Sequence, residues 1–189
     1  MYKRQLEDLA TRDPLSGCLN RRAFNVGLHR LYDQALESGR TLVCIMADID
    51  HFKSINDRFG HQVGDEVIRS VATILTDGVR SDDLVGRYGG EEFCVVIAGI
   101  TRERGGQLVE KLRERIAANR SVRTETGEQI EFTASFGMTW LDLGARNEVE
   151  LVDQADQAMY AAKQAGRNRT ITYSKHGDIA PELVTGTLP

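Results

Sequence analysis

Residues 87–97 read Arg-Tyr-Gly-Gly-Glu-Glu-Phe-Cys-Val-Val-Ile, with a glycine pair between two short apolar runs. Glycine accepts the positive φ angles that a two-residue hairpin loop demands, so this stretch predicts the tip of a β-hairpin. Glu91 and Glu92 follow the turn directly, where a strand should begin. Adjacent carboxylates are poor strand formers that repel each other, so we expect a cation to be held beside them.

A second apolar run also ends in acidic residues. Residues 42–47 have the length and β-branched content of a buried strand, and Asp48-Ile49-Asp50 follows them. Alternation along a strand places both aspartates on the same side of the sheet. If the two strands are neighbours, Asp48 and Glu91 converge into an all-oxygen site suited to Mg²⁺. The turn pattern by itself is also common in ordinary hairpins with surface glutamates.

The composition indicates one α/β domain, since 189 residues with 41% hydrophobic content can bury a sizeable core. A net charge of −4 with interspersed signs gives no basic face, so no polynucleotide partner is expected. Cys18, Cys44 and Cys94 form no C-x-x-C pair, which favours buried free thiols in a reducing compartment. No stretch approaches the roughly 20 apolar residues of a membrane span, and no signal-like N-terminus is present, so we expect a cytoplasmic protein.

Hydrophobic periodicity predicts an alternation of helices and strands around the hairpin. Helices are predicted at 20–36 with Asn20 as N-cap, at 55–59, from an N-cap at Asp65 onward, at 101–119, and at 148–165 with Gly166 as C-cap; further strands are predicted at 130–139 and 170–173. This order favours an α+β fold with a mixed, mainly antiparallel central sheet covered by helices. A doubly wound Rossmann sheet is disfavoured, because no glycine-rich phosphate loop stands at a strand-to-helix junction.

Several motifs, in order, resemble those of the GGDEF domain, the catalytic domain of bacterial diguanylate cyclases. The hairpin tip resembles the family signature in its Gly-Gly-Glu-Glu-Phe form. Residues 13–22 resemble the N-terminal motif, 48–57 the metal-strand motif, 59–65 the nucleotide loop and 155–168 the final helix. Departures from the commonest pattern are small: Ser16 replaces threonine, Cys18 lies in the N-terminal motif, and His51 stands beside the metal strand.

The resemblance implies a domain organisation and an architecture. The catalytic domain would span residues 13–174, residues 1–12 would end a connecting helix from an upstream sensor or membrane region, and residues 175–189 would form a flexible tail. Its fold would be similar to the palm of nucleotidyl cyclases and polymerases.

The implied reaction is the condensation of two GTP molecules into cyclic di-GMP and two pyrophosphates. A 3′-hydroxyl attacks an α-phosphate in line, with two Mg²⁺ ions per active site and Mn²⁺ as an alternative. Asp48, the Ile49 carbonyl and Glu91 are the expected metal ligands, and Glu92 and Asp50 are second choices. Glu92 could instead assist proton transfer, and Asp50 could simply satisfy nearby backbone.

The resemblance also assigns residues to the substrate. Asn56 and Asp65 would bind the guanine base; Phe52, Lys53, Gly89, Gly90, Lys163 and Arg167 would meet the phosphates. Lys163 and Arg167 stand four residues apart at the end of the predicted helix, hence on one face. Read without the resemblance, they are ordinary charges favoured by a helix C-terminus, and Asp65 is an ordinary N-cap.

Two further expectations concern assembly and control. Because the product joins two GTP molecules head to tail, two domains would face each other as a transient symmetric homodimer. Arg80 and Asp83 form an Arg-x-x-Asp pattern at the family's spacing from Gly89, which implies an inhibitory site for cyclic di-GMP. The alternative function is a non-catalytic cyclic di-GMP receptor that uses the same two residues.

Overall fold

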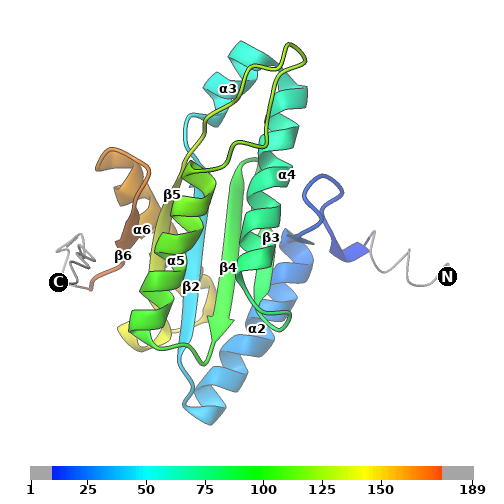
Figure 1. Ribbon diagram of the computed structural model, residues 1–189. Helices are drawn as coiled ribbons and strands as arrows, with labels where there is room; N and C mark the ends of the chain where they lie inside the picture. The colour runs from blue at the N-terminus through cyan, green and yellow to red at the C-terminus, as the bar shows by residue number, and fades with distance from the viewer. Residues whose placement is uncertain (1–9, 176–189) are drawn as a thin grey trace.

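The computed structural model describes residues 10–175, which build one six-stranded sheet in the order β1-β3-β4-β2-β5-β6 (Figure 1). The strands are β1 (Leu19–Asn20), β2 (Leu42–Ile49), β3 (Leu84–Arg87), β4 (Glu92–Ala98), β5 (Ala134–Trp140) and β6 (Thr170–Thr172). The helices are α2 (Arg21–Ser38), α3 (Phe52–Phe59), α4 (His61–Gly78), α5 (Arg102–Ala117), α6 (Glu148–Gln164) and the 3₁₀ turn η1 (Leu141–Leu143). Much of the predicted connecting helix and tail falls on residues 1–9 and 176–189, outside the described residues.

Strand β2 lies at the centre of the sheet, with β4 and β5 antiparallel on its two sides. The edge strands β1 and β6 pair in parallel with β3 and β5. The mixed, mainly antiparallel sheet that the sequence predicts is therefore confirmed, and the predicted hairpin is formed by β3 and β4.

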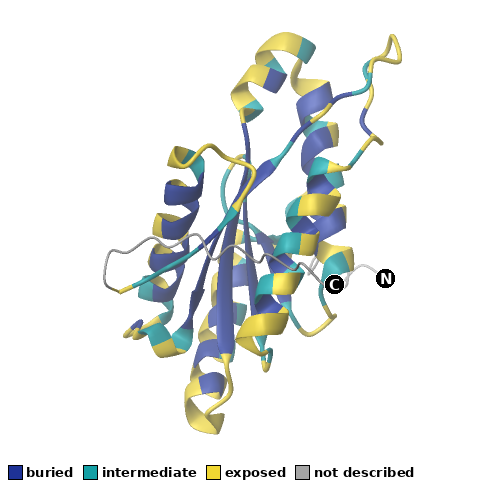
Figure 2. Ribbon diagram, turned by 60° about the vertical axis from the view of Figure 1, so that its left-hand side comes forward, coloured by how far each residue is buried: buried dark blue, intermediate teal, exposed yellow. Residues whose placement is uncertain are grey.

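Helices cover both faces of the sheet, which explains why β2 is buried at every position (Figure 2). Alternate residues of β2 enter different layers. Val43 and Ile45 pack in the core layer of α4 and α5, while Cys44 and Met46 pack in the layer of α2 and α6. Cys44 and Cys94 are buried free thiols, as is Cys18. Among the described helices, none is long and apolar enough to span a membrane.

The predicted N-cap at Asp65 is wrong, because α4 begins four residues earlier at His61. Gly60 separates α3 from α4, and its φ of 86° reverses the chain without the steric cost that a side chain would meet. Gly64, expected to lie in the break, is buried inside α4. A Cβ at this position would collide with Asn56 Oδ1, so the two helices pack closely there.

Two other boundaries differ from the prediction. Strand β5 begins at Ala134 and not at residue 130, although Ile130 and Phe132 are buried in the core as their alternation predicts. Helix α6 ends at Gln164 with Ala165 as its cap, one residue before the predicted Gly166. Gly166 instead takes a φ of 114° in the turn that follows the helix.

Candidate active site

The acidic ends of β2 and β4 lie side by side. Asp48 is opposite Glu92 in the antiparallel ladder, and the Ile49 amide donates to the Glu91 carbonyl over 3.3 Å. Antiparallel pairing brings the end of one strand next to the start of its neighbour. The structure thus brings together Asp48, Glu91 and Glu92, the residues that the sequence predicts for the catalytic centre.

Asp48 is buried to 5% exposure, and its carboxylate is paired with an ammonium from α6. Lys163 Nζ lies 2.7 Å from Asp48 Oδ2. The pKa of Asp48 is raised from 3.8 to about 6. Burial is the largest cause, the hydrogen bond and charge of Lys163 oppose the increase, and Glu91 and Glu92 add to it. The end of β2 therefore holds more negative charge than one lysine balances.

A hard divalent cation fits this donor set, because carboxylates and a backbone carbonyl are the oxygen ligands that Mg²⁺ prefers. Glu91 and Glu92 contribute to the raised pKa of Asp48, because their negative charges repel its ionised form. A bound cation would offset this repulsion. Across residues 10–175, no three acidic, histidine or cysteine side chains are gathered closely enough to hold a metal ion. The expected ligand set has two such side chains, Asp48 and Glu91, together with the Ile49 carbonyl.

Asp50 has a different environment, although it was a second choice for metal binding. Its side chain accepts from Thr133 Oγ1 and Ser135 Oγ at 2.6 Å each and from the Asn168 amide at 3.0 Å. The residue is 4% exposed. This arrangement favours the alternative interpretation, in which Asp50 satisfies nearby polar groups and joins β2, β5 and the turn after α6.

An arginine braces the hairpin tip, a feature that the sequence interpretation missed. Arg87 donates to the Gly90 carbonyl through Nε at 3.1 Å and Nη2 at 2.6 Å, and to Asp13 Oδ1 through Nη1 at 3.0 Å. Asp13 also accepts from Ser16, through the amide at 2.8 Å and Oγ at 2.7 Å. Burial alone would raise the pKa of Asp13, but the hydrogen bonds from Ser16 and Arg87 outweigh it and lower the pKa. The Asp13-x-x-Ser16 spacing was a local signal of the Asp13 turn only, and it did not indicate Arg87.

The residues predicted for the base lie on the packed pair α3 and α4. Asn56 is half-buried on α3, and Asp65 is half-buried one turn into α4. Within the described residues, the buried Asn56 Oδ1 has no hydrogen-bond partner. An unpaired buried acceptor is costly, so this atom is suited to receive a donor from a ligand. Lys53 is exposed on α3, and Phe52 is half-buried against the core.

Lys163 and Arg167 do not lie on one helix face, which corrects the prediction. Because α6 ends at Gln164, Arg167 lies in the following turn with a φ of 62°. Its amide still donates to the Ala162 carbonyl over 3.0 Å, so the turn folds back onto the last turn of α6. Arg167 itself is exposed.

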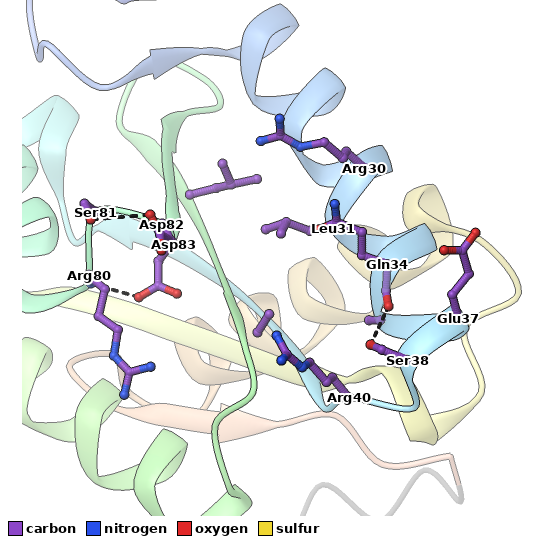
Figure 3. Close-up of a pocket in the computed structure, with 13 residues that line it drawn as sticks. Arg30, Leu31, Gln34, Glu37, Ser38, Arg40, Arg80, Ser81, Asp82 and Asp83 are labelled. Atoms are coloured by element: carbon purple, nitrogen blue, oxygen red, sulfur yellow. Dashed lines mark hydrogen bonds between the residues drawn. The ribbon is translucent and has the colours of Figure 1, made fainter.

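Arg80 and Asp83 line a separate pocket of about 880 Å³ between the α4–β3 turn and α2 (Figure 3). The Arg80 amide donates to Asp83 Oδ2 at 2.8 Å, which leaves the guanidinium free of that turn. Burial raises the pKa of Asp83, whereas its contacts with Arg80 lower it. Arg30 and Arg40 contribute further positive charge to the lining, and neither was singled out from the sequence. The sequence did not indicate them, because both arginines are far in the chain from Arg80 and Asp83.

The antiparallel-centred sheet, its helical layers and the acidic strand ends define a nucleotidyl cyclase-like domain of the palm type. Residues 10–169 match the family model "Diguanylate cyclase, GGDEF domain", and the chain therefore belongs to the GGDEF family. This family assignment agrees with the resemblance seen in the motifs.

Curated relatives and solved structures point the same way. The chain is 38% identical over 169 residues to the probable diguanylate cyclase DgcT of Escherichia coli, covering 89% of this chain and 37% of DgcT. It is 41% identical over 160 residues to the diguanylate cyclase DgcP of Pseudomonas aeruginosa, covering 85% of this chain and 23% of DgcP. The chain thus spans well under half the length of these relatives.

The coiled coil and GGDEF domain of DgcB from Caulobacter crescentus, solved in complex with c-di-GMP, has a similar structure. The TM-score is 0.85 at 33% identity, and the match covers 90% of each chain. The fold described here is therefore that of a GGDEF domain.

Proposed function

We propose that this chain is a diguanylate cyclase domain, which condenses two GTP molecules into cyclic di-GMP and two pyrophosphates. The main support is the position of Asp48, a buried carboxylate beside Glu91 and Glu92 at a glycine-glycine hairpin tip. The membership in the GGDEF family adds to this support. The relatives named as diguanylate cyclases support the proposed reaction as well as the fold.

Asp48, the Ile49 carbonyl and Glu91 would hold Mg²⁺, with Mn²⁺ as an alternative. When bound, two such ions supply charge that lowers the pKa of the attacking 3′-hydroxyl and balances the triphosphate. Lys163 would release Asp48 and turn to a phosphate oxygen, an exchange that its long flexible stem permits. Glu92, directly opposite Asp48 in the ladder, is placed to hold a metal or to accept the hydroxyl proton.

The base and the phosphates would bind to different sets of residues. Asn56 and Asp65 would recognise guanine, since the unpaired Asn56 Oδ1 can accept from the guanine N2 amino group and a carboxylate can accept from N1–H. Adenine lacks both donors at these positions, which gives selectivity for GTP. Lys53, the Phe52 backbone and Arg167 would meet the phosphates, and Gly89 and Gly90 would allow close approach at the hairpin tip.

Two domains would have to meet for turnover. Each half-site holds one GTP, so a symmetric homodimer places the 3′-hydroxyl of one GTP against the α-phosphate of the other. Dimerisation then becomes a point at which an upstream region can control the rate.

The pocket at Arg80 and Asp83 is proposed as the inhibitory site for cyclic di-GMP. An arginine guanidinium can donate to guanine O6 and N7, and an aspartate can accept from guanine N1–H and N2 amino groups. Arg30 and Arg40 lie in the same pocket and would balance the two phosphodiesters of the product. Feedback inhibition should weaken in an Arg80→Ala variant while turnover at low product concentration persists.

A non-catalytic receptor for cyclic di-GMP is the second candidate. It is favoured by the separation of the Arg80 pocket from the acidic strand ends, and by the pairing of Asp48 with Lys163. A receptor would need only the pocket, so binding of cyclic di-GMP without turnover is its expected behaviour.

The decisive experiment incubates the protein with GTP and Mg²⁺ at high protein concentration and separates the nucleotides afterwards. The parent should form cyclic di-GMP, and Glu91→Gln should form none. Glu103→Gln is the matched control and should keep full activity, because this exposed glutamate is in the first turn of α5, which follows the opposite end of β4 from Glu92. If the parent binds cyclic di-GMP but forms none, even when two copies are forced together, the receptor function replaces the cyclase.

A further inference from the structure

The turn after α6 is held by contacts that the proposed reaction does not use. Arg167 and Asn168 have φ angles of 62° and 45°, in the left-handed region that residues with a Cβ rarely adopt. Such a conformation persists only where surrounding contacts fix it. The contacts that do so come from β2 on one side and from α5 on the other.

The contact from β2 is made by Asp50. Its Oδ2 accepts from the Asn168 backbone amide at 3.0 Å, and hydroxyls of Thr133 and Ser135 hold the same carboxylate. Because Asp50 is buried and accepts three hydrogen bonds, one of them from Ser135 on β5, the carboxylate cannot move without breaking several of them. It therefore anchors the backbone of the turn directly after Arg167.

The contact from α5 is made by Arg113. Its Nη1 donates to Asn168 Oδ1 at 2.6 Å, while Nε and Nη2 are occupied by Glu110 of the same helix. The Arg113 side chain is only 16% exposed, although it carries a full charge. The planar guanidinium is thus oriented by Glu110 and presents its remaining edge to the turn, a geometry that lysine could not reproduce.

We propose that Arg113 and Asp50 are positioning residues for Arg167. They hold the side chain and the backbone of Asn168, and so fix the turn in the conformation that presents Arg167 to the triphosphate of GTP. The last turn of α6 carries Lys163, which is itself paired with Asp48, so both cations are tied to the end of β2. This inference rests on the proposed GTP site, and it assigns the phosphate-binding geometry to residues outside that site.

The test measures dissociation constants for two nucleotides with Mg²⁺ present. The first is 3′-deoxyGTP, which lacks the attacking hydroxyl and cannot react; the second is GMP, which lacks the β- and γ-phosphates. Arg113→Met should weaken 3′-deoxyGTP binding about tenfold and leave GMP binding unchanged, because only the outer phosphates lose a partner. Arg115→Met is the matched control on an exposed arginine of the same helix and should change neither constant.

A double-mutant cycle separates positioning from a general structural effect. In an Arg167→Met background, Arg113→Met should cause no further loss of 3′-deoxyGTP affinity, since the two residues act through one contact. Arg113→Lys keeps the charge and the apolar stem and serves where Arg113→Met folds poorly; it should show the same selective loss. Equal weakening of GMP and 3′-deoxyGTP, or independent effects of Arg113 and Arg167, would overturn the inference.

The same measurements distinguish a failure of the proposed GTP site from a failure of the positioning role. If the parent binds neither nucleotide, the proposed function fails and the positioning role fails with it. If the parent binds 3′-deoxyGTP and Arg167→Met weakens it while Arg113→Met does not, the GTP site stands and only the positioning role is wrong.

Discussion

Asp48 and Asp50 lie two residues apart at the end of β2, yet their carboxylates have opposite kinds of partners. Both are almost fully buried. Asp48 meets one lysine ammonium on a long side chain, whereas Asp50 meets two hydroxyls and a backbone amide. Since burial and residue type are alike, the number and kind of partners separate a carboxylate that can exchange its partner for a ligand from one that holds the fold.

The largest expected effect comes from removing the available carboxylate. Asp48→Asn keeps the shape of the side chain but removes the charge that would hold Mg²⁺, so formation of cyclic di-GMP should fall about 1,000-fold. Nucleotide separation after incubation with GTP measures this loss. A variant that keeps more than a tenth of the parent rate would show that Asp48 is not a metal ligand.

The neighbouring carboxylate should affect stability instead. Asp50→Asn points an amide group at donors that need an acceptor, and leaves at least one of them buried and unpaired. We expect a loss of about 3 kcal/mol in the free energy of unfolding. Urea denaturation measures it, with Asp48→Asn as the matched control. If the two variants lose equal stability, the distinction between the two carboxylates disappears.

One hydroxyl can be removed from the Asp50 network without touching the carboxylate. Ser135→Ala deletes the donor to Asp50 Oδ1 and should lower the free energy of unfolding by about 1.5 kcal/mol. The same denaturation series measures it. Ser70→Ala, at a site remote from the network, is the control and should change stability by much less. A change in Ser135→Ala as small as in the control would mean that the hydrogen bond from Ser135 to Asp50 does not stabilise the fold.

The smallest effect concerns pH. Because the folded pKa of Asp48, about 6, lies above its usual 3.8, ionisation between these values costs the folded state stability. Asp48→Asn removes that cost, so the variant should match the parent near pH 4 and exceed it by about 1 kcal/mol at pH 8. This is less than the full pKa difference, because the effective dielectric constant of protein sites is higher than that of a dry interior. Denaturation at the two pH values without Mg²⁺ measures this.

An opposite trend, with the parent gaining on Asp48→Asn as pH rises, would mean that Lys163 stabilises the ionised carboxylate more than burial penalises it. The pKa of Asp48 would then lie below its usual value. The acidic strand ends would then carry no unbalanced negative charge for a cation to offset.

Local sequence was enough to predict most of the framework. The hairpin, the buried strand β2 and the Asn20 cap of α2, whose side chain accepts from the Ala23 amide, follow from short-range patterns of apolar and turn residues. The convergence of Asp48 with Glu91 followed from assuming that two strands are neighbours. The predictions that failed concerned where elements begin or end: a break over residues 60–64 was predicted, but α4 begins at His61, directly after Gly60.

Contacts between residues far apart in the chain could not be predicted in this way. Asp50 and Asn168 are 118 residues apart, and nothing near either one indicates that they meet. Asp13 and Arg87 are separated by 74 residues, so the brace of the hairpin tip was equally hidden. Arg113 lies on a helix whose pattern indicates only a buried face and a charged face. The roles of such residues can be inferred only once the fold shows which residues they contact.

The most direct test compares cyclic di-GMP formation by the parent, Asp48→Asn and Asp50→Asn at equal concentrations of folded protein, with GTP and Mg²⁺. The account predicts product from the parent, no detectable product from Asp48→Asn, and a reduced but measurable rate from Asp50→Asn, because a looser turn misplaces Arg167 without removing the metal site. Product from Asp48→Asn at the parent rate would contradict the account.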